Sequence, residues 1–181
     1  AIANVALPAI AFDLHVSPAE VVWVVNIYQI AMVTTLLPLA ALGDIVGLKR
    51  LYLAGLVLFT AGSLACAFAP SLPALLVARA AQGLGASSLM SINTALVRFI
   101  YPRRLLGQGF GWNALVVAIS FSVGPTVAAG VLSVAHWPWL FGINVPFGIV
   151  AVFIALRTLP ETPKGAHAFD TIGAIMASAC L

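Results

Sequence analysis

The side chains that most often do chemistry in proteins are few in this chain and lie far apart. Its two cysteines, Cys66 and Cys180, are both in apolar stretches, and no CxxC or zinc-type Cys/His spacing is present. His15, His136 and His167 fall in three separate connections, so we expect no common metal site. The sequence has no glycine-rich phosphate-binding loop and no G-x-S-x-G elbow. We therefore predict neither an enzyme nor a bound metal or cofactor.

One residue stands out, because Arg79 is the only charged residue between Arg50 and Arg98. Placing an arginine at the centre of a bilayer costs about 2.5–3.5 kcal/mol on insertion scales, so such residues usually face a bundle interior or a water-filled cavity. Gln82 and Gly83 follow three and four residues later, on the same face of a helix. Two interpretations are open: Arg79 faces the bundle interior, or it snorkels to the lipid headgroups from near the end of its helix.

A row of small residues marks another apolar stretch. Ser120, Gly124 and Ala128 recur every four residues, which places them on one face of a helix. Pro125 removes a backbone donor within that helix and frees a carbonyl one turn earlier, which predicts a bend or pivot. The alternative is an ordinary packing seam between neighbouring helices.

The third feature is a short charged turn, GDIVGLKR, from Gly43 to Arg50. Its two glycines permit a tight reversal of the chain. The carboxylate of Asp44 could accept hydrogen bonds from a helix N-terminus or pair with a basic side chain. The alternative is an ordinary charged turn without a special role.

The composition defines the elements that must position these residues. Of the 181 residues, 62% are hydrophobic and only 7% are charged, and the mean hydropathy is +1.12. Soluble domains carry about 25% charged and about 45–50% apolar residues, and disordered chains are still richer in charge. Both classes are therefore excluded. We predict an all-α integral membrane protein, because the apolar runs are continuous and lack the alternation of a membrane barrel.

The spacing of the charges separates the membrane-spanning helices. A helix needs roughly 20 residues to cross about 30 Å of hydrocarbon. The 52 uncharged residues between Arg104 and Arg157 must hold two spans with a turn at 136–139, and the stretch 51–97 must hold two with a turn at 70–73. The helices are expected at about 1–12, 21–42, 51–69, 74–96, 107–134 and 139–156. The first is expected to be an incomplete span, and a seventh is expected to begin at 171–181 after a loop at 157–170.

The basic residues predict the orientation of these helices. Seven of the eight Lys and Arg residues fall in one set of connections, and the opposite set has none. That opposite set holds Asp13, His15, Glu20 and His136. We expect the basic side and the missing N-terminus to be cytoplasmic, which explains the positive balance without nucleic-acid binding. Trp23, Trp137 and Trp139 are expected at the outer membrane interface.

Together the three features resemble the major facilitator superfamily, specifically its fourteen-helix drug:proton antiporter branch. The turn is similar to the superfamily signature between helices 2 and 3: it keeps Leu42, Asp44, Gly47 and a basic pair, and departs from it at Ala40 and Ile45. Residues 79–86, RAAQGLGA, resemble the helix 4 motif RxxQGxGaa without departure. In the helix at 107–134, the residues that align with the antiporter motif are Gly111, Ser120, Gly124 and Pro125.

Further segments extend the resemblance along nearly the whole chain. Residues 4–8, NVALP, resemble the end of helix 1 of that branch, and Trp23 and Tyr28 fit its helix 2 pattern. Residues 136–146, HWPWLFGINVP, resemble its WRWIFxINVP segment, with Pro138 in place of the arginine. The 14-residue loop at 157–170 is shorter than the central loop that twelve-helix members commonly have.

The resemblance implies a fold and an activity. Residues 1–156 would form the N-terminal six-helix half, built from two inverted three-helix repeats and paired with the C-terminal half of the same chain. The protein would be a multi-pass transporter of the cell (inner) membrane that works by alternating access. It would export lipophilic or cationic drugs in exchange for protons.

The resemblance also implies roles for individual residues. Arg79 and Gln82 would serve proton coupling, and the proton-carrying acid is expected at the start of helix 1, before this chain begins. Gly111, Gly124 and Pro125 would form the antiporter motif that suppresses leak and bends. The cytoplasmic gate against the other half would consist of Asp44, Gly47, Lys49 and Arg50, weakened by Ile45 in place of the usual arginine.

The substrate cavity is the least defined part of the sequence. Candidate lining residues are Asn26, Gln29, Asn93, Trp112 and Asn113, which are polar or aromatic residues within or near the spans. Each could instead be a helix–helix hydrogen bond or an interface anchor. Two other functions remain open: export of another metabolite, such as an amino acid, peptide or antibiotic, and a non-transporting membrane scaffold or receptor.

Overall fold

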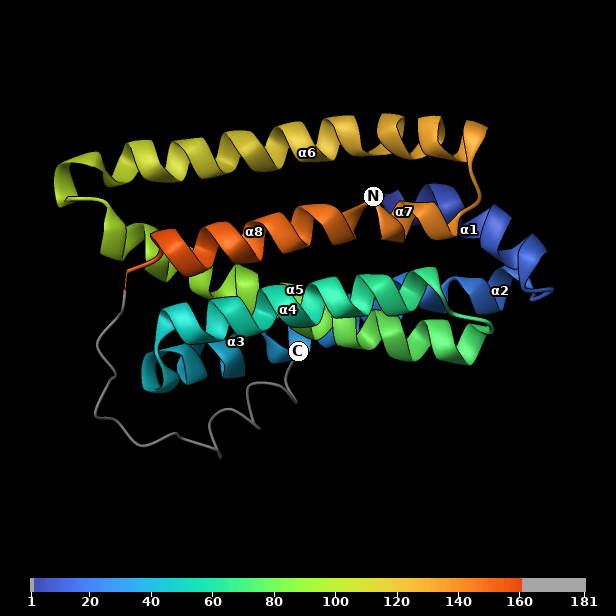
Figure 1. Ribbon diagram of the computed structural model, residues 1–181, viewed down its shortest axis with the longest axis horizontal. Helices are drawn as coiled ribbons and strands as arrows, with labels where there is room; N and C mark the ends of the chain where they lie inside the picture. The colour runs from blue at the N-terminus through green and yellow to red at the C-terminus, as the bar shows by residue number, and fades with distance from the viewer. Residues whose placement is uncertain (1, 161–181) are drawn as a thin grey trace.

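The computed structural model describes residues 2–160, and every regular element in that range is helical (Figure 1). Residue 1 and residues 161–181 lie outside the described range. Most of the expected loop at 157–170 and the whole of the expected helix at 171–181 therefore fall outside the described residues.

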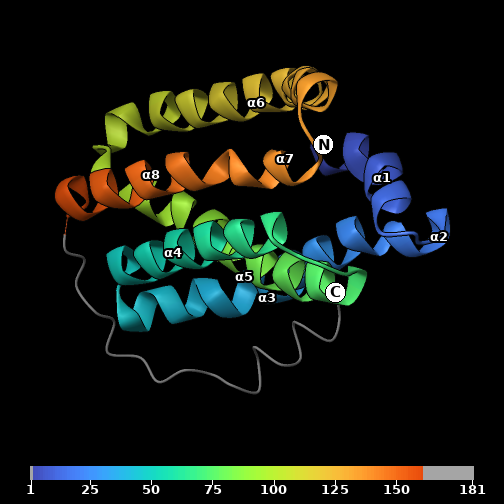
Figure 2. The same ribbon diagram turned by 45° about the vertical axis from the view of Figure 1, so that its right-hand side comes forward.

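The long helices run back and forth along one axis (Figures 1 and 2). In chain order the elements are α1 (Ile2–Asp13), α2 (Pro18–Val21), α3 (Trp23–Val46), α4 (Leu48–Ala67), α5 (Leu72–Ile100), the 3-10 turn η1 (Arg103–Leu105), α6 (Leu106–Val134), α7 (Pro138–Gly142) and α8 (Asn144–Thr158). Five helical segments of the described range are long and apolar enough to cross a membrane. With 12 residues, α1 is shorter than the roughly 20 that a span needs.

Several helices extend beyond the expected bounds. The helix expected at 74–96 runs from Leu72 to Ile100, with Arg98 in its last turn, where a cation is favourable beside the free carbonyls. The reversal expected over residues 43–50 takes a single residue, because Gly47 alone joins α3 to α4. Its φ of 104° is in the left-handed range that favours glycine, whereas Gly43 is a buried residue inside α3.

The last span is divided into two helices. A single helix is expected at 139–156, but α7 ends at Gly142 and α8 begins at Asn144. The cause is Pro146, which has no N–H group to donate to the carbonyl of Gly142 one turn earlier. Beyond this break, α8 packs closely on α4, where a side chain at Gly148 would collide with Thr60.

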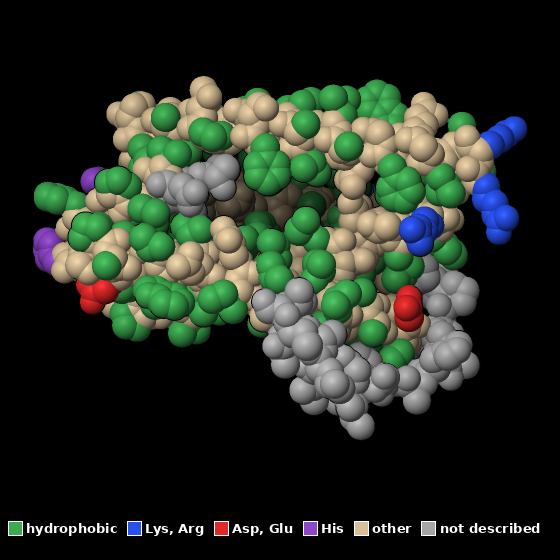
Figure 3. Space-filling view, turned by 180° about the vertical axis from the view of Figure 1, so that it is seen from behind, with side chains coloured by type: hydrophobic (Ala, Val, Ile, Leu, Met, Phe, Trp, Pro, Cys, Tyr) green, Lys and Arg blue, Asp and Glu red, His purple; other side chains and the backbone are tan. Residues whose placement is uncertain are grey.

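The two ends of the bundle carry different charges (Figure 3). At one end, which we call the acidic end, Asp13 and Glu20 lie between the end of α1 and the start of α3, and His136 lies between α6 and α7. The opposite end, which we call the basic end, carries Asp44 and the arginines Arg50, Arg98, Arg103, Arg104 and Arg157. Consecutive long helices thus alternate in direction between these two ends.

Glycines allow α5 to pack in the centre with its backbone against both neighbours. A Cβ atom at Gly85 would lie 2.5 Å from the backbone nitrogen of Phe59 in α4. A Cβ atom at Gly83 would lie 2.6 Å from the carbonyl oxygen of Tyr28 in α3. Because no side chain fits at these contacts, the glycines set the close approach of α3 and α4 to α5.

The larger of two buried clusters lies toward the acidic end, and we call it the acidic-end cluster. Its buried members come from nearly every element: Ala6, Ile10, Val21, Val24, Cys66, Leu75, Ala78, Ala128, Trp137, Leu140 and Phe141. A smaller cluster toward the basic end contains Leu51, Ile92 and Leu96, without a buried residue of α6. The surface is hollowed below the middle of α6 (Figure 3).

Trp137, one of the three tryptophans expected at the outer membrane interface, packs inside the protein at the acidic end. Its side chain is 4% exposed and belongs to the acidic-end cluster, whereas Trp23 and Trp139 are 52% and 64% exposed. The indole Nε1–H donates to Oδ2 of Asp13 at 2.8 Å. Burial is tolerated because this bond satisfies the only polar atom of the side chain.

The backbone contact at Gly85 gives a test of the fold. We expect Gly85→Ala in the full-length protein to lower the free energy of unfolding by about 1–3 kcal/mol, because the added methyl group collides with the backbone of Phe59. Thermal unfolding in detergent measures the effect. Gly107→Ala is the matched control, since no atom lies within 4 Å of a Cβ at Gly107. Equal stability of the two variants would contradict the packing.

Candidate functional site

Arg79 projects into the bundle from the first half of α5. The helix begins at Leu72 after Ser71, and Pro73 occupies its first turn, where a missing N–H costs nothing. Arg79 and Gln82 are three residues apart and therefore lie on one face of α5. Both side chains are buried, with 6% and 2% of their surfaces exposed.

The guanidinium group of Arg79 is held by neutral acceptors. Its Nε–H donates to the carbonyl oxygen of Val24 in α3 at 3.0 Å, and Nη1 donates to Oε1 of Gln82. The side chain thus turns inward to a partner 55 positions away in the chain. The interpretation that Arg79 snorkels to the headgroups is wrong.

Gln82 extends this hydrogen-bonded network to α4. Its Nε2 donates to Oγ of Ser63 at 2.6 Å, and the Ser63 hydroxyl donates to the carbonyl oxygen of Phe59 at 2.8 Å. Ser63 is fully buried. Each polar group in the series from Arg79 to Ser63 donates to the next, so the network fixes the orientation of the Gln82 amide.

Aromatic rings cover the guanidinium group. The guanidinium carbon of Arg79 lies 4.2 Å from the ring centroid of Tyr28 in α3 and 5.5 Å from that of Phe141 in α7. A cation over the face of an aromatic ring is attracted by the ring's negative quadrupole. The rings and the carbonyl dipoles therefore replace part of the water that the guanidinium lacks.

No carboxylate balances this charge in the part of the chain that the structure describes. The acceptors of Arg79 there are a backbone carbonyl and an amide, and no ion pair joins Arg79 to Asp or Glu within residues 2–160. A buried charge without a counter-ion is costly. The site therefore has the electrostatics to attract a carboxylate or to lower the proton affinity of an acid brought close to it. Residues 2–160 contain no group of three His, Cys, Asp or Glu side chains that could hold a metal ion.

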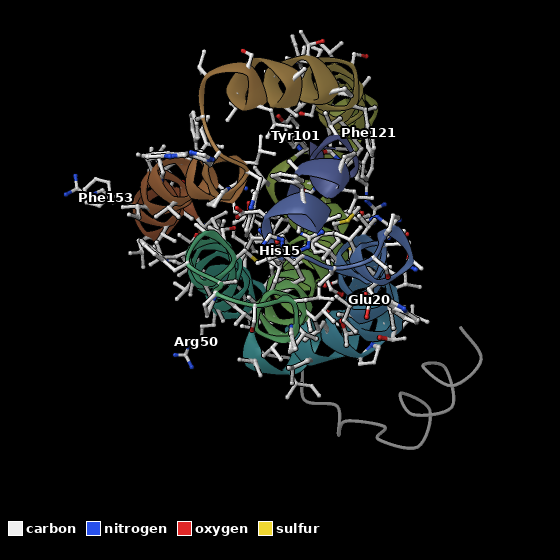
Figure 4. All side chains as sticks on the ribbon, turned by 90° about the vertical axis from the view of Figure 1, so that its right-hand side faces the viewer. His15, Glu20, Arg50, Tyr101, Phe121 and Phe153 are labelled. Carbon is white, nitrogen blue, oxygen red and sulfur yellow. The ribbon has the colours of Figure 1, made fainter. Side chains whose placement is uncertain are left out.

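The turn at the basic end is arranged differently from the Arg79 site. Asp44 is in the last turn of α3, Gly47 is the linking residue, and Lys49 and Arg50 are in the first turn of α4. Asp44 and Arg50 are exposed, and the Arg50 side chain points away from the bundle in Figure 4. The turn is a surface feature of the described residues, remote from the buried network.

The small-residue row on α6 is in contact with neighbours over only part of its length. Gly124 and Ala128 are buried, whereas Ser120 is exposed and its hydroxyl donates to the carbonyl of Val116 in its own helix. Gly111 and Pro125 are also exposed, and α6 is continuous through Pro125. Only the end of the row nearest the acidic end packs, because that is where α6 meets the acidic-end cluster.

The structure does not bring the five candidate cavity residues together. Asn93 of α5 donates from Nδ2 to Oδ1 of Asn113 in α6 at 3.0 Å, so these two form a helix–helix hydrogen bond. Trp112 is 57% exposed, Gln29 is exposed and Asn26 is half-buried. None of the five lines the groove of about 410 Å³ at the acidic end, which is formed by Phe68 and Trp139 with other apolar residues of α4, α7 and α8.

Two features can be compared with known proteins: the inward arginine and glutamine on α5, and the one-residue glycine turn between α3 and α4. The family model described as Major Facilitator Superfamily matches residues 1–178. The chain belongs to the Major Facilitator Superfamily. It is an all-α membrane protein of that family, and the residues given span part of a longer fold.

Several curated relatives are similar to the chain over nearly all of its length. It is 54% identical over 180 residues to "Uncharacterized transporter YebQ" of Escherichia coli (strain K12), covering 97% of this chain and 39% of the relative. It is 35% identical to "Riboflavin transporter RibZ" of Clostridioides difficile (strain 630), covering 99% and 40%. It is 36% identical to "Multidrug resistance protein Stp" of Mycobacterium tuberculosis (strain ATCC 25618 / H37Rv), covering 97% and 33%. The chain thus spans about two fifths or less of the length of these relatives.

Sequence reasoning missed the partners that hold Arg79. The sequence does not single out Ser63 or Phe141 as site residues. It cannot single out the carbonyl of Val24 either, because every residue has a backbone carbonyl. A partial signal existed for Ser63, since a serine in the apolar stretch of α4 is a polar group that must find a partner. The sequence does not say which helix supplies it.

Removing the central amide tests the network. We expect Gln82→Leu to lower the free energy of unfolding by about 1–3 kcal/mol, because Arg79 loses an acceptor and Ser63 loses a donor in a buried site. Gln29→Leu is the control, since Gln29 is an exposed glutamine on α3. Thermal unfolding of both full-length variants measures the difference. Equal stability would mean that Gln82 is not part of a buried network.

Proposed function

We propose that the full-length protein is a secondary transporter that exports lipophilic or cationic compounds in exchange for protons by alternating access. The observation that carries the proposal is the buried charge of Arg79, which has no carboxylate partner within residues 2–160, in a member of the Major Facilitator Superfamily. Such a charge is expensive in a membrane and is usually retained for a function.

The chemistry of Arg79 supports proton coupling. A fixed cation lowers the proton affinity of a carboxylate near it and raises that affinity again when the two separate. We infer that the proton-carrying acid lies outside the described residues and that Gln82 keeps Arg79 in place while the acid changes its protonation state. A change of conformation that alters their separation would then couple proton release to transport.

The remaining motifs receive roles consistent with this mechanism. The basic end would face the cytoplasm of a cell whose inner membrane the protein spans, because basic loops stay on that side. Asp44, Gly47, Lys49 and Arg50 would then form a gate against the second half of the transporter. The exposed Gly111 and Pro125, together with Gly124, would form a surface of α6 that moves against that half.

The relatives support two substrate classes. The 36% identity to a protein named for multidrug resistance favours lipophilic or cationic drugs. The 35% identity to a protein named as a riboflavin transporter favours a second candidate, transport of riboflavin or another small metabolite. A transport assay that includes both classes decides between them.

Dye efflux in energised cells tests the proposed function. We expect the full-length protein to lower ethidium accumulation and an uncoupler to abolish the effect. Arg79→Lys should slow efflux about tenfold or more, because lysine cannot reproduce the paired hydrogen bonds of the guanidinium, each worth about 1.5–3 kcal/mol. Arg98→Ala, which removes an exposed arginine of the same helix, is the control.

The same assay identifies the outcomes that contradict the proposal. Unchanged accumulation across a panel of lipophilic cations, together with riboflavin transport, would replace drug export by the second candidate. Efflux that persists with an uncoupler would exclude proton coupling. Full activity of Arg79→Lys would remove Arg79 from the mechanism.

A further inference from the structure

We propose that Asp13 and Trp137 form a latch that closes the Arg79 site toward the acidic end, and that both are positioning residues for Arg79. The inference rests on the proposed function, since a latch of this kind closes one side of an alternating-access carrier. It is carried by a continuous series of contacts from the acidic end to the guanidinium group.

The first contact joins two elements that are distant in the chain. Trp137 donates its indole N–H to the Asp13 carboxylate at 2.8 Å, across 124 positions of sequence. Asp13 is the last residue of α1, and Trp137 directly precedes α7. Asp13 is exposed and Trp137 is buried, so this bond joins the surface at the end of α1 to the interior at the start of α7.

The next contacts lead inward from Trp137 to Arg79. The rings of Trp137 and Phe141 meet edge to face, with centroids 6.2 Å apart and an angle of 81° between them. Phe141 in turn lies over the Arg79 guanidinium, with its ring centroid 5.5 Å from the guanidinium carbon. Both rings are 4% exposed. The position of Phe141 over Arg79 therefore depends on Trp137, which Asp13 holds.

Other polar groups at the acidic end do not take part in this series. Glu20 forms a capping box with Ser17, accepting from the Ser17 N–H at 2.8 Å and from its hydroxyl at 2.7 Å. His15 and His136 are exposed. Glu20 thus offers a matched control: an acidic residue of the same end whose hydrogen bonds stay within its own turn.

The arrangement suits a reversible closure. Opening the acidic end would require the Asp13–Trp137 hydrogen bond to break and Phe141 to move off Arg79 as the acidic-end cluster separates. Water would then reach the guanidinium from that side. The bond is strong enough to bias the closed state and weak enough to be broken in each cycle, as a two-state element requires.

Cys66 reports directly on the latch. It is fully buried in the acidic-end cluster together with Trp137 and Phe141. In the full-length protein with every other cysteine replaced, a membrane-impermeant methanethiosulfonate reagent is applied to de-energised membrane vesicles. Phe68→Cys, at a position that is 78% exposed at the acidic end of α4, shows which side the reagent must be applied to.

The variants have defined expected results. Asp13→Ala and Trp137→Phe should each raise the labelling rate of Cys66 about tenfold or more, the size expected for losing a hydrogen bond to a charged group. Asp13→Asn keeps an acceptor and should stay near the parent rate, as should Glu20→Ala. Combining Asp13→Ala with Trp137→Phe should add nothing further, because both remove one bond.

Three results would overturn the latch. They are an unchanged labelling rate in both single variants, equal acceleration by Glu20→Ala, and additive effects in the double variant. Trp137→Phe keeps an aromatic ring at this position while removing the N–H donor, and it keeps the test decisive even where Asp13→Ala fails to fold. Labelling requires no transport, so absent dye efflux would contradict the proposed function without changing the labelling result.

Discussion

A guanidinium group inside an apolar bundle has to be solvated by the protein itself, and this constraint organises the described part of the chain. Arg79 reaches the Val24 carbonyl on one side and Gln82 on the other, while Tyr28 and Phe141 cover it. These groups come from α3, α5 and α7, so the position of one charge depends on how three helices pack. Losing any of them would leave a buried charge poorly compensated.

The glycine contacts of α5 make this solvation possible. Gly83 lets the backbone of α3 approach closely enough for its carbonyls to accept hydrogen bonds from side chains of α5. On the other side, a Cβ atom at Gly62 of α4 would lie 2.9 Å from the backbone nitrogen of Gln82. Close packing and buried polarity are therefore parts of one arrangement. The acceptors of Arg79 within the described residues are neutral, so they orient the guanidinium without cancelling its charge, as the proposed proton coupling requires.

The sequence predicted the features that follow from local periodicity. Continuous apolar runs separated by charges predict helices, and the spacing of Arg79 and Gln82 places them on one face. Contacts across long separations could not be predicted: Ser63 meets Gln82 across 19 positions and Asp13 meets Trp137 across 124. The preference of tryptophan for headgroups is an average, and it does not show that Trp137 packs inside the protein with its indole N–H bonded to Asp13. The continuous apolar run predicts a single helix at 139–156, whereas Pro146 divides it into α7 and α8.

The central claim is that Arg79 is solvated inside the bundle by groups of the protein rather than by headgroups or water. Cryo-electron microscopy of the full-length protein in lipid nanodiscs, at a resolution that shows side chains, tests it most directly. The account predicts density for the guanidinium within hydrogen-bonding distance of the Val24 carbonyl and Gln82, stacked on Tyr28. An Arg79 side chain extended to the lipid headgroups would contradict it.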